Sequence, residues 1–311
     1  MGDKVIKQHY VPQFYLDTFT SNGKLQCYDK KQKKYYGGAK RDLAEARYFY
    51  DPDKNITKRD EQIFDLALER VETRIAPIFK KIVNICNNSS NLYSALITTK
   101  TERVDLSLFI CLQIYRTNKF RNIQHEMYDN FFSKLIQLID EPDVHSNSQA
   151  TKEKPYQIDD TINHLKVLFN EEFINAYSSF LLDSSWTFMA NNTEIPFITS
   201  DSPICRIPRF YESWDGNETE IPFLNDQLEL YFPLSPHVIL KIFRKESHEY
   251  ERLYKYRNKL IPLTNIDMVN MINLFQLYRS HERVFFNQNS KSLIEQYLKE
   301  LPEAGKINYS V

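Results

Sequence analysis

Glycine is scarce in this chain, and that scarcity restricts what the chain can fold into. Six glycines occur in 311 residues, and none lies between Gly38 and Gly216. P-loops and dinucleotide-binding turns place several glycines where a strand enters a helix, because only a backbone without Cβ atoms approaches phosphates closely. The G-x-S-x-G turn of the α/β-hydrolases is also absent. We therefore set aside P-loop nucleotide hydrolysis, Rossmann redox chemistry and that hydrolase class.

The rest of the composition is that of a large folded protein without a dominant charge. With 42% hydrophobic and 14% aromatic residues, the chain can bury a sizeable core. Forty Lys and Arg residues against 41 Asp and Glu exclude a uniformly basic coat but allow local patches. The four cysteines show no C-x-x-C spacing, and no apolar run reaches the ~20 residues of a membrane span. Without an apolar leader, the sequence predicts a cytoplasmic protein with no membrane partner.

A helical pattern dominates the middle of the chain, from about residue 57 to 182. Apolar residues recur at helical spacing after Thr57-x-x-Asp60, with Pro77 expected to kink or break that helix. A second helix is expected from about 99 to 139, and a third over 161–182, after an exposed loop at 140–160. The second helix is apolar nearly all round near its middle, which is typical of a central buried helix.

Strand-like patterns dominate the part from about residue 186 to 290. The runs at 186–190 and 195–199 are expected to form a hairpin, and a further strand is expected near the amino terminus at Lys24–Asp29. Helices followed by antiparallel strands predict an α+β fold. Its long central helices would pack with a mainly antiparallel sheet from the N-terminal and C-terminal parts, within a single domain over residues 1–311.

Several short motifs follow one another in an order that resembles a known family. They are HYVPQFYL from His9, QIYRT from Gln113, FITSDSP from Phe197 and FPLSP from Phe232. The chain resembles a large bacterial domain-of-unknown-function family, numbered 4238, whose members begin with HYVPQ-type motifs. The resemblance spans most of the chain but implies no established activity, so the residues themselves must suggest the function.

His9 belongs to the first motif, in a segment that Pro12 favours as extended. A histidine here could act as a general base or bind a metal ion. The alternative is a histidine that hydrogen-bonds the backbone and fixes the N-terminal segment to the core. The other histidines show neither H-E-x-x-H nor H-x-H spacing, so a zinc hydrolase is not expected.

Gln113 and Arg116 share one face of the most apolar helix, because they stand three residues apart. A buried arginine keeps its charge and needs an anion nearby. That anion could be a phosphate or carboxylate of a ligand, with Gln113 as a second donor. An internal ion pair with Glu61, Glu69 or Asp201 is equally compatible with the sequence.

Two carboxylates complete the predicted site. Glu61 lies nearest the capped end of an acidic row, where it could bind a metal or act as a base, although such rows are usually solvated. Asp201 and Ser200 follow an apolar run, a common place for catalytic groups. There, Asp201 could hold a metal, orient His9 or act as a base, and Ser200 could donate to an anion. The alternative is a turn closed by its own side chains.

Residues 241–260 combine seven Lys or Arg residues with three tyrosines. Cationic side chains can follow a phosphate backbone while aromatic rings stack on bases. The alternative is a solvated helix face with the tyrosines packed inward.

Together these features predict a phosphodiester- or nucleotide-directed enzyme, such as a nuclease-like toxin or phage-defence effector. The predicted catalytic residues are His9, Glu61 and Asp201, and the predicted anion- or substrate-binding residues are Gln113, Arg116 and Ser200. Mg²⁺ stays open as a cofactor, since magnesium sites need only one or two carboxylates. Two alternatives remain: a non-catalytic module that binds nucleic acid or protein, and a buried His–Arg–Asp network that only locks the N-terminal segment.

Overall fold

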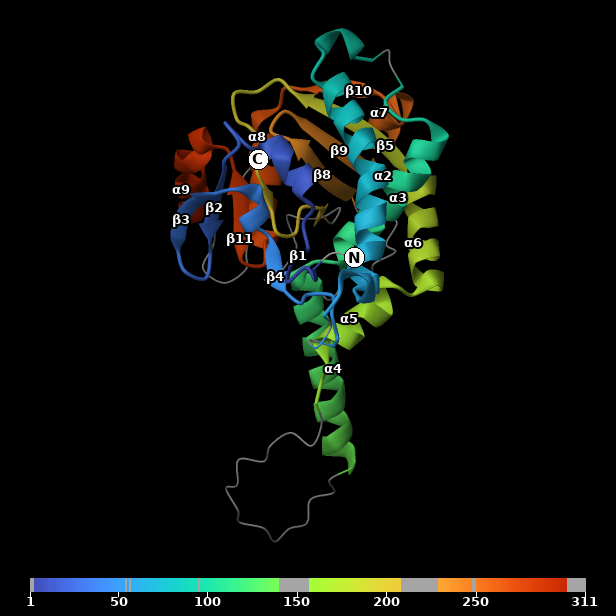
Figure 1. Ribbon diagram of the computed structural model, residues 1–311. Coiled ribbons are helices and arrows are strands. Elements are labelled where there is room, and N and C mark those ends of the chain that lie inside the picture. The colour runs from blue at the N-terminus through green and yellow to red at the C-terminus, as the bar shows by residue number, and fades with distance from the viewer. Residues whose placement is uncertain are drawn as a thin grey trace.

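The protein has an α+β fold, as the sequence predicts. Helices from the middle of the chain stand beside β-sheets built from its N-terminal and C-terminal parts (Figure 1). The single domain expected over the whole chain stays a prediction. A computed structural model describes residues 3–53, 55, 57–93, 96–139, 157–207, 229–247 and 250–300.

The largest sheet has five strands in the order β10-β5-β9-β8-β7 and comes from the C-terminal part. β8 and β9 are buried along their whole length, because both faces of this sheet are covered. They pair antiparallel, as predicted, whereas β10 runs parallel to β5. The strands are β5 Ser185–Asn191, β7 Cys205–Ile207, β8 Glu229–Ser235, β9 Val238–Phe243 and β10 Leu260–Leu263.

A four-stranded antiparallel sheet joins the two ends of the chain. In the order β3-β2-β11-β6, the N-terminal hairpin of β2 and β3 lies beside the C-terminal β11. This confirms a sheet built from both parts, although the structure divides the strands among several sheets. A separate two-stranded sheet pairs β1 with β4. These strands are β1 Lys7–His9, β2 Leu25–Asp29, β3 Lys34–Gly38, β4 Glu45–Arg47, β6 Thr199–Ser200 and β11 Arg283–Phe286.

The hairpin predicted at 186–199 is wrong. β6 pairs with β11, while β5 pairs with β9 and β10. The apolar run before β6 does not form a strand because its amides bond elsewhere: Phe197 donates to the Pro236 carbonyl, and Ile198 donates to the side chain of Asn273. The end of this apolar run, Phe197 and Ile198, is buried in the core without strand pairing.

Two of the predicted long helices are each a pair of shorter ones. The helix expected at 99–139 ends at Tyr115 and restarts at Asn118, because the Thr117 hydroxyl accepts a hydrogen bond from the Phe120 amide and caps a new helix. The Asn170 side chain caps α6 in the same way. α2 continues unbroken through Pro77. The helices are α1 Gln13–Leu16, α2 Ile63–Cys86, α3 Lys100–Tyr115, α4 Asn118–Ile139, α5 Asp160–Leu168, α6 Glu171–Asp183, α7 Tyr250–Leu253, α8 Ile266–Arg279 and α9 Lys291–Glu300.

The position of α3 confirms the prediction of a central buried helix. It packs against α2 and α6, and its side chains join the largest hydrophobic cluster. α4 contacts α5 and α3, and its C-terminal end extends away from the other described elements (Figure 1). Most of the loop predicted at 140–160 lies outside the described residues.

Three of the sequence motifs meet at Tyr15, which is fully buried. Its ring stacks on Phe232 with 5.1 Å between the ring centroids. Its hydroxyl lies 2.6 Å from the Thr199 hydroxyl and donates to the Pro233 carbonyl at 2.8 Å. The N-terminal motif is therefore bound into the core by the FITSDSP and FPLSP segments.

Candidate functional site

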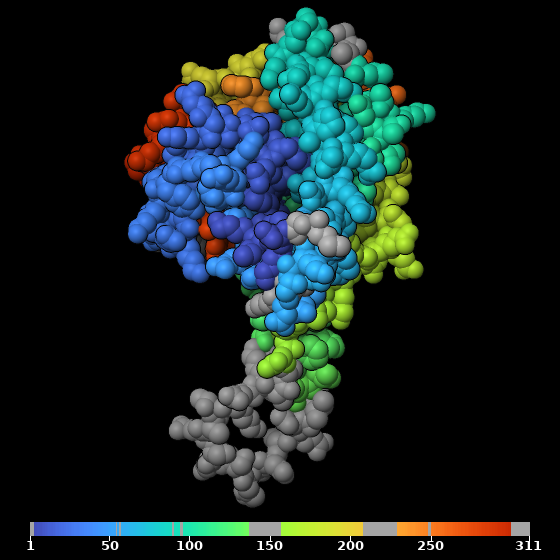
Figure 2. All heavy atoms as spheres, in the orientation of Figure 1, coloured from blue at the N-terminus to red at the C-terminus, as the bar shows by residue number. Residues whose placement is uncertain are grey.

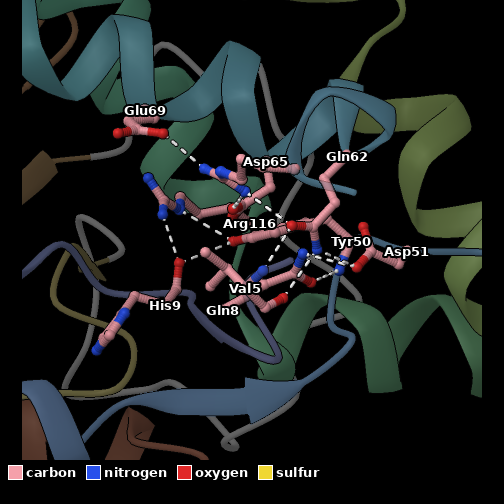
Figure 3. Close-up of polar contacts among 10 residues, drawn as sticks. Val5, Gln8, His9, Tyr50, Asp51, Gln62, Asp65, Glu69 and Arg116 are labelled. Carbon is pink, nitrogen blue, oxygen red and sulfur yellow. Dashed lines mark hydrogen bonds and ion pairs between the residues drawn. The ribbon is translucent and has the colours of Figure 1, made fainter. Parts of the chain in front are cut away.

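Arg116 ends α3 and is 2% exposed, with its charge paired inside the chain. Its Nη1 lies 2.7 Å from Glu72 of α2, Nη2 donates to the His9 carbonyl at 2.6 Å, and Nε donates to the Tyr50 hydroxyl at 3.2 Å. Figure 3 shows the bonds to His9 and Tyr50. Burial opposes the charge of Arg116, but Tyr50 and Glu72 outweigh burial and raise its pKa. The internal anion exists, but it is Glu72 and not one of the three acids named from the sequence.

His9 contributes its backbone, not its ring, to this centre. The imidazole points away from Arg116 in Figure 3, with Nε2 at 3.0 Å from the Arg41 carbonyl oxygen. Gln113 holds the next residue, because its Nε2 donates to the Tyr10 carbonyl at 3.1 Å. The structure therefore brings Gln113, Arg116 and the backbone of residues 9–10 together.

A layer of buried polar side chains continues from this centre along the N-terminal segment. Gln8 and Gln62 both donate to one oxygen of Asp51, at 2.9 and 2.6 Å (Figure 3). Gln62 also exchanges two hydrogen bonds of 2.8 Å with the Val5 backbone. Figure 2 shows the N-terminal part of the chain beside α2 on one face of the molecule. Sequence reasoning missed Gln8, Asp51 and Gln62, because isolated polar residues carry no periodic signal.

Glu61 is exposed and lies at the start of the α2 region rather than in a shared site. One carboxylate oxygen accepts from the backbone amides of Thr57 at 3.1 Å and Lys58 at 3.3 Å. These two bonds lower its pKa. The carboxylate therefore serves as a local cap, and the capping residue is Glu61 instead of the Asp60 expected from the sequence.

Asp201 is 2% exposed and holds the chain that leads into β11. Its two oxygens accept from the backbone amides of His281, Glu282 and Arg283 at 2.7–2.9 Å. Burial raises its pKa, and the three amide bonds act in the opposite direction. Ser200 is also buried and donates to Gln276 at 2.8 Å. The Ser200 hydroxyl also accepts from the Ser202 amide at 3.2 Å, as the alternative of a self-closed turn expects, whereas Asp201 bonds a distant part of the chain.

Tyr10 lies between the two groups of predicted residues. Gln113 holds its carbonyl, while burial and then the negative charge of Asp201 raise the pKa of its phenol. No three His, Cys, Asp or Glu side chains in the described ranges are grouped closely enough to hold a metal ion. The catalytic and anion-binding roles of the six residues stay predictions, and Mg²⁺ stays open.

A cleft of about 470 Å³ lies at the start of α3. Its lining has three cations, Lys100, Arg103 and Arg257, and one acid, Asp183, among the described residues. The other lining residues are Val104, Leu182, Ser184, Ser185 and Tyr254. Sequence reasoning singled out the stretch with Tyr254 and Arg257, but not Lys100 and Arg103, which are far away in the chain.

Arg103 is anchored in this cleft without a carboxylate contact in the described part of the chain. Its guanidinium lies 5.0 Å from the Trp186 ring, and Nη2 donates to the carbonyls of Leu182 and Ser184. Its Nε is buried and has no hydrogen-bond partner among the described residues. Burial lowers the pKa of Arg103, and the nearby Asp183 only partly opposes this effect.

Tyr254 and Arg257 line one side of the cleft, and Tyr250 stacks on Tyr254 beside it. The centroids of the two tyrosine rings are 4.7 Å apart with an interplanar angle of 29°, and the Arg257 guanidinium lies 4.5 Å from the Tyr254 ring centroid. Tyr254 is 40% exposed, whereas Tyr250 and Tyr256 pack against a hydrophobic cluster, as the alternative for this stretch proposed.

The sequence of this chain matches a known protein family. The family described as "Protein of unknown function (DUF4238)" matches residues 7–290. The chain belongs to this family. The match runs from β1 to beyond β11, so membership covers both the Arg116 centre and the cleft. No curated protein and no solved structure showed significant similarity to the chain. Among the described helices, none is long and apolar enough to cross a membrane.

Proposed function

We propose that this protein binds nucleotides or nucleic acid through the cleft at the start of α3. The observation that carries the proposal is the convergence of Lys100, Arg103 and Arg257 on a cleft that also exposes the Tyr254 ring. Lysine and arginine are the side chains that bind phosphates, and aromatic or guanidinium planes stack on bases. The pairing of both in one cleft fits a ligand that has phosphates and bases.

The state of Arg103 supports an anionic ligand. A guanidinium removed from water loses solvation, and carbonyl dipoles compensate for this less than a negative charge does. Asp183, the acid in the lining, is exposed and therefore screened by water. A bound phosphate would supply the negative charge that is missing from the contacts of Arg103, and it would also interact with Lys100.

Hydrolysis is not required by this proposal. The nuclease-like toxin or phage-defence effector predicted from the sequence needs a general base that is free to accept a proton. Asp201 instead accepts three backbone hydrogen bonds, and Glu61 caps its own turn. Binding is the function that the cleft supports best, and nucleolytic activity is measured in the same experiment.

The test compares two double variants that each remove two positive charges. Lys100→Ala/Arg257→Ala changes the cleft, and Lys34→Ala/Arg47→Ala changes exposed residues on β3 and β4. Fluorescence anisotropy with labelled oligonucleotides, and competition by nucleotides, should show at least a tenfold weaker affinity for the cleft variant only. Equal affinity of both variants, or no binding by the unchanged protein, would overturn the proposal. Gel analysis of the incubated oligonucleotides with Mg²⁺ reports cleavage.

A further inference from the structure

Resting on the proposed function, we infer that the ligand of the cleft is a single-stranded nucleic acid. One of its bases would stack on the guanidinium of Arg257, and the adjacent phosphate would bind Lys100 and Arg103. The inference depends on the order of the stack, the size of the cleft and the position of the cations.

The stack has an end that can be extended. Tyr250 begins α7, Tyr254 begins the 3₁₀ turn that follows it, and Arg257 comes directly after that turn with its guanidinium 4.5 Å from the Tyr254 ring centroid. Arg257 is exposed, and its Nη1 lies 3.5 Å from the Tyr254 carbonyl, which helps to keep the guanidinium in place. A guanidinium plane that is already stacked on one side offers its other side to a base with little loss of side-chain entropy.

The stacking partner must be a base that has left its own stack. In a duplex, both faces of each internal base are covered by neighbouring bases, and only the edges remain accessible. A cleft of about 470 Å³ is within the size range of small-ligand sites. It can take in part of a single strand, whereas the body of a duplex stays outside.

The cations stand where the phosphate of the stacked nucleotide would lie. Lys100 is in the first turn of α3 and Arg103 follows three residues later, so both are at the same end of the helix. Arg103 is held at Nη2 by two carbonyls, and its position is therefore set before a ligand binds.

The experiment separates stacking from charge. Arg257→Lys keeps the charge but removes the plane, and Arg47→Lys makes the same change on β4, where Arg47 is exposed. Anisotropy titrations use a labelled 12-residue single strand, a hairpin duplex of the same composition and an acidic peptide of the same charge. We expect the single strand to bind at least tenfold more tightly than the duplex, and Arg257→Lys to weaken its binding roughly tenfold without changing the salt dependence.

The possible outcomes distinguish this inference from the proposed function. Equal affinity for duplex and single strand, or an Arg257→Lys variant that binds like the unchanged protein, would overturn stacking while leaving nucleic-acid binding in place. Binding of the acidic peptide as tightly as the single strand would show a protein partner and overturn both. Absence of any binding would also overturn both. The Arg47→Lys control should match the unchanged protein with every ligand.

Discussion

The Arg116 centre and the cleft contain the same kinds of side chain but differ in what surrounds the positive charge. Arg116 contacts a carboxylate, a carbonyl and a phenol, whereas Arg103 contacts two carbonyls and the face of a tryptophan. A buried charge that has a carboxylate partner is electrostatically complete, and removing one member of the pair destabilises the fold. A half-buried charge held only by dipoles, beside an open cleft, can still gain from an anion.

The comparison also shows that burial alone does not identify a binding cation. Arg121 is half-buried and binds the neutral ring of His164 and the Phe49 carbonyl, and its guanidinium lies 3.7 Å from the Phe49 ring. Burial lowers its pKa to about 10. Arg121 resembles Arg103 in this respect, but the residues that line the cleft do not include it.

The largest expected effect is the loss of the Arg116 centre. Arg116→Ala should lower the free energy of unfolding by about 3–5 kcal/mol, because Glu72 and the His9 carbonyl lose their partner. Arg74→Ala is the matched control: it removes an α2–α3 ion pair with Asp105 in which Arg74 is half exposed. The control should lower the free energy of unfolding by less than about 1 kcal/mol. Urea denaturation measures the free energy of unfolding of both variants. A similar decrease in the two would contradict the claim that the buried Arg116 pair matters more than the exposed Arg74 pair.

A pH-dependent effect should come from His164, the neutral partner of Arg121. Its Nε2 lies 2.7 Å from the Tyr115 carbonyl, and burial, followed by the charge of Arg121, lowers its pKa to about 3. The unfolded chain binds a proton near pH 6.5, so folding stability is complete above that pH and is lost as pH falls toward 3. The loss should approach roughly 1.4 kcal/mol per pH unit within this window.

The variant His164→Gln isolates this contribution. It keeps a donor for the Tyr115 carbonyl and an acceptor for Arg121, but it does not titrate. Urea denaturation at pH 7, 6 and 5 should show a smaller decline for the variant than for the unchanged protein. Parallel declines would mean that His164 is protonated in the folded state.

The smallest effect on stability is expected at Arg103. Arg103→Gln keeps an N–H donor for the carbonyls of Leu182 and Ser184 but removes the charge, so the free energy of unfolding should change by about 1 kcal/mol or less. Its effect on single-strand binding should be large by comparison, with weaker binding and a salt slope lower by about 0.7. A destabilisation as large as that of Arg116→Ala, with unchanged binding, would show that Arg103 stabilises the fold and does not bind the ligand.

The sequence predicted several of these features for reasons that the structure confirms. Apolar residues on nearly all sides of the helix over Val104–Tyr115 indicated that it is central and buried. The positive charge of Arg116 at its end required an anion from the chain or from a ligand. The motifs identified the family, and the basic, aromatic stretch contained two residues of the cleft. The ends of the helices were harder to predict from the sequence, since a cap such as Thr117 is a single side chain within a continuous apolar pattern.

What only the tertiary structure decided is which groups meet. Glu61, Glu69 and Glu72 are alike in sequence, but the packing of α2 against α3 places Glu72 at Arg116 and leaves Glu61 in a cap. In the same way, the cleft joins the first turn of α3 to the segment after α7. A sequence determines which side chains need a partner because burial follows from local pattern, whereas the partner itself depends on how distant elements pack.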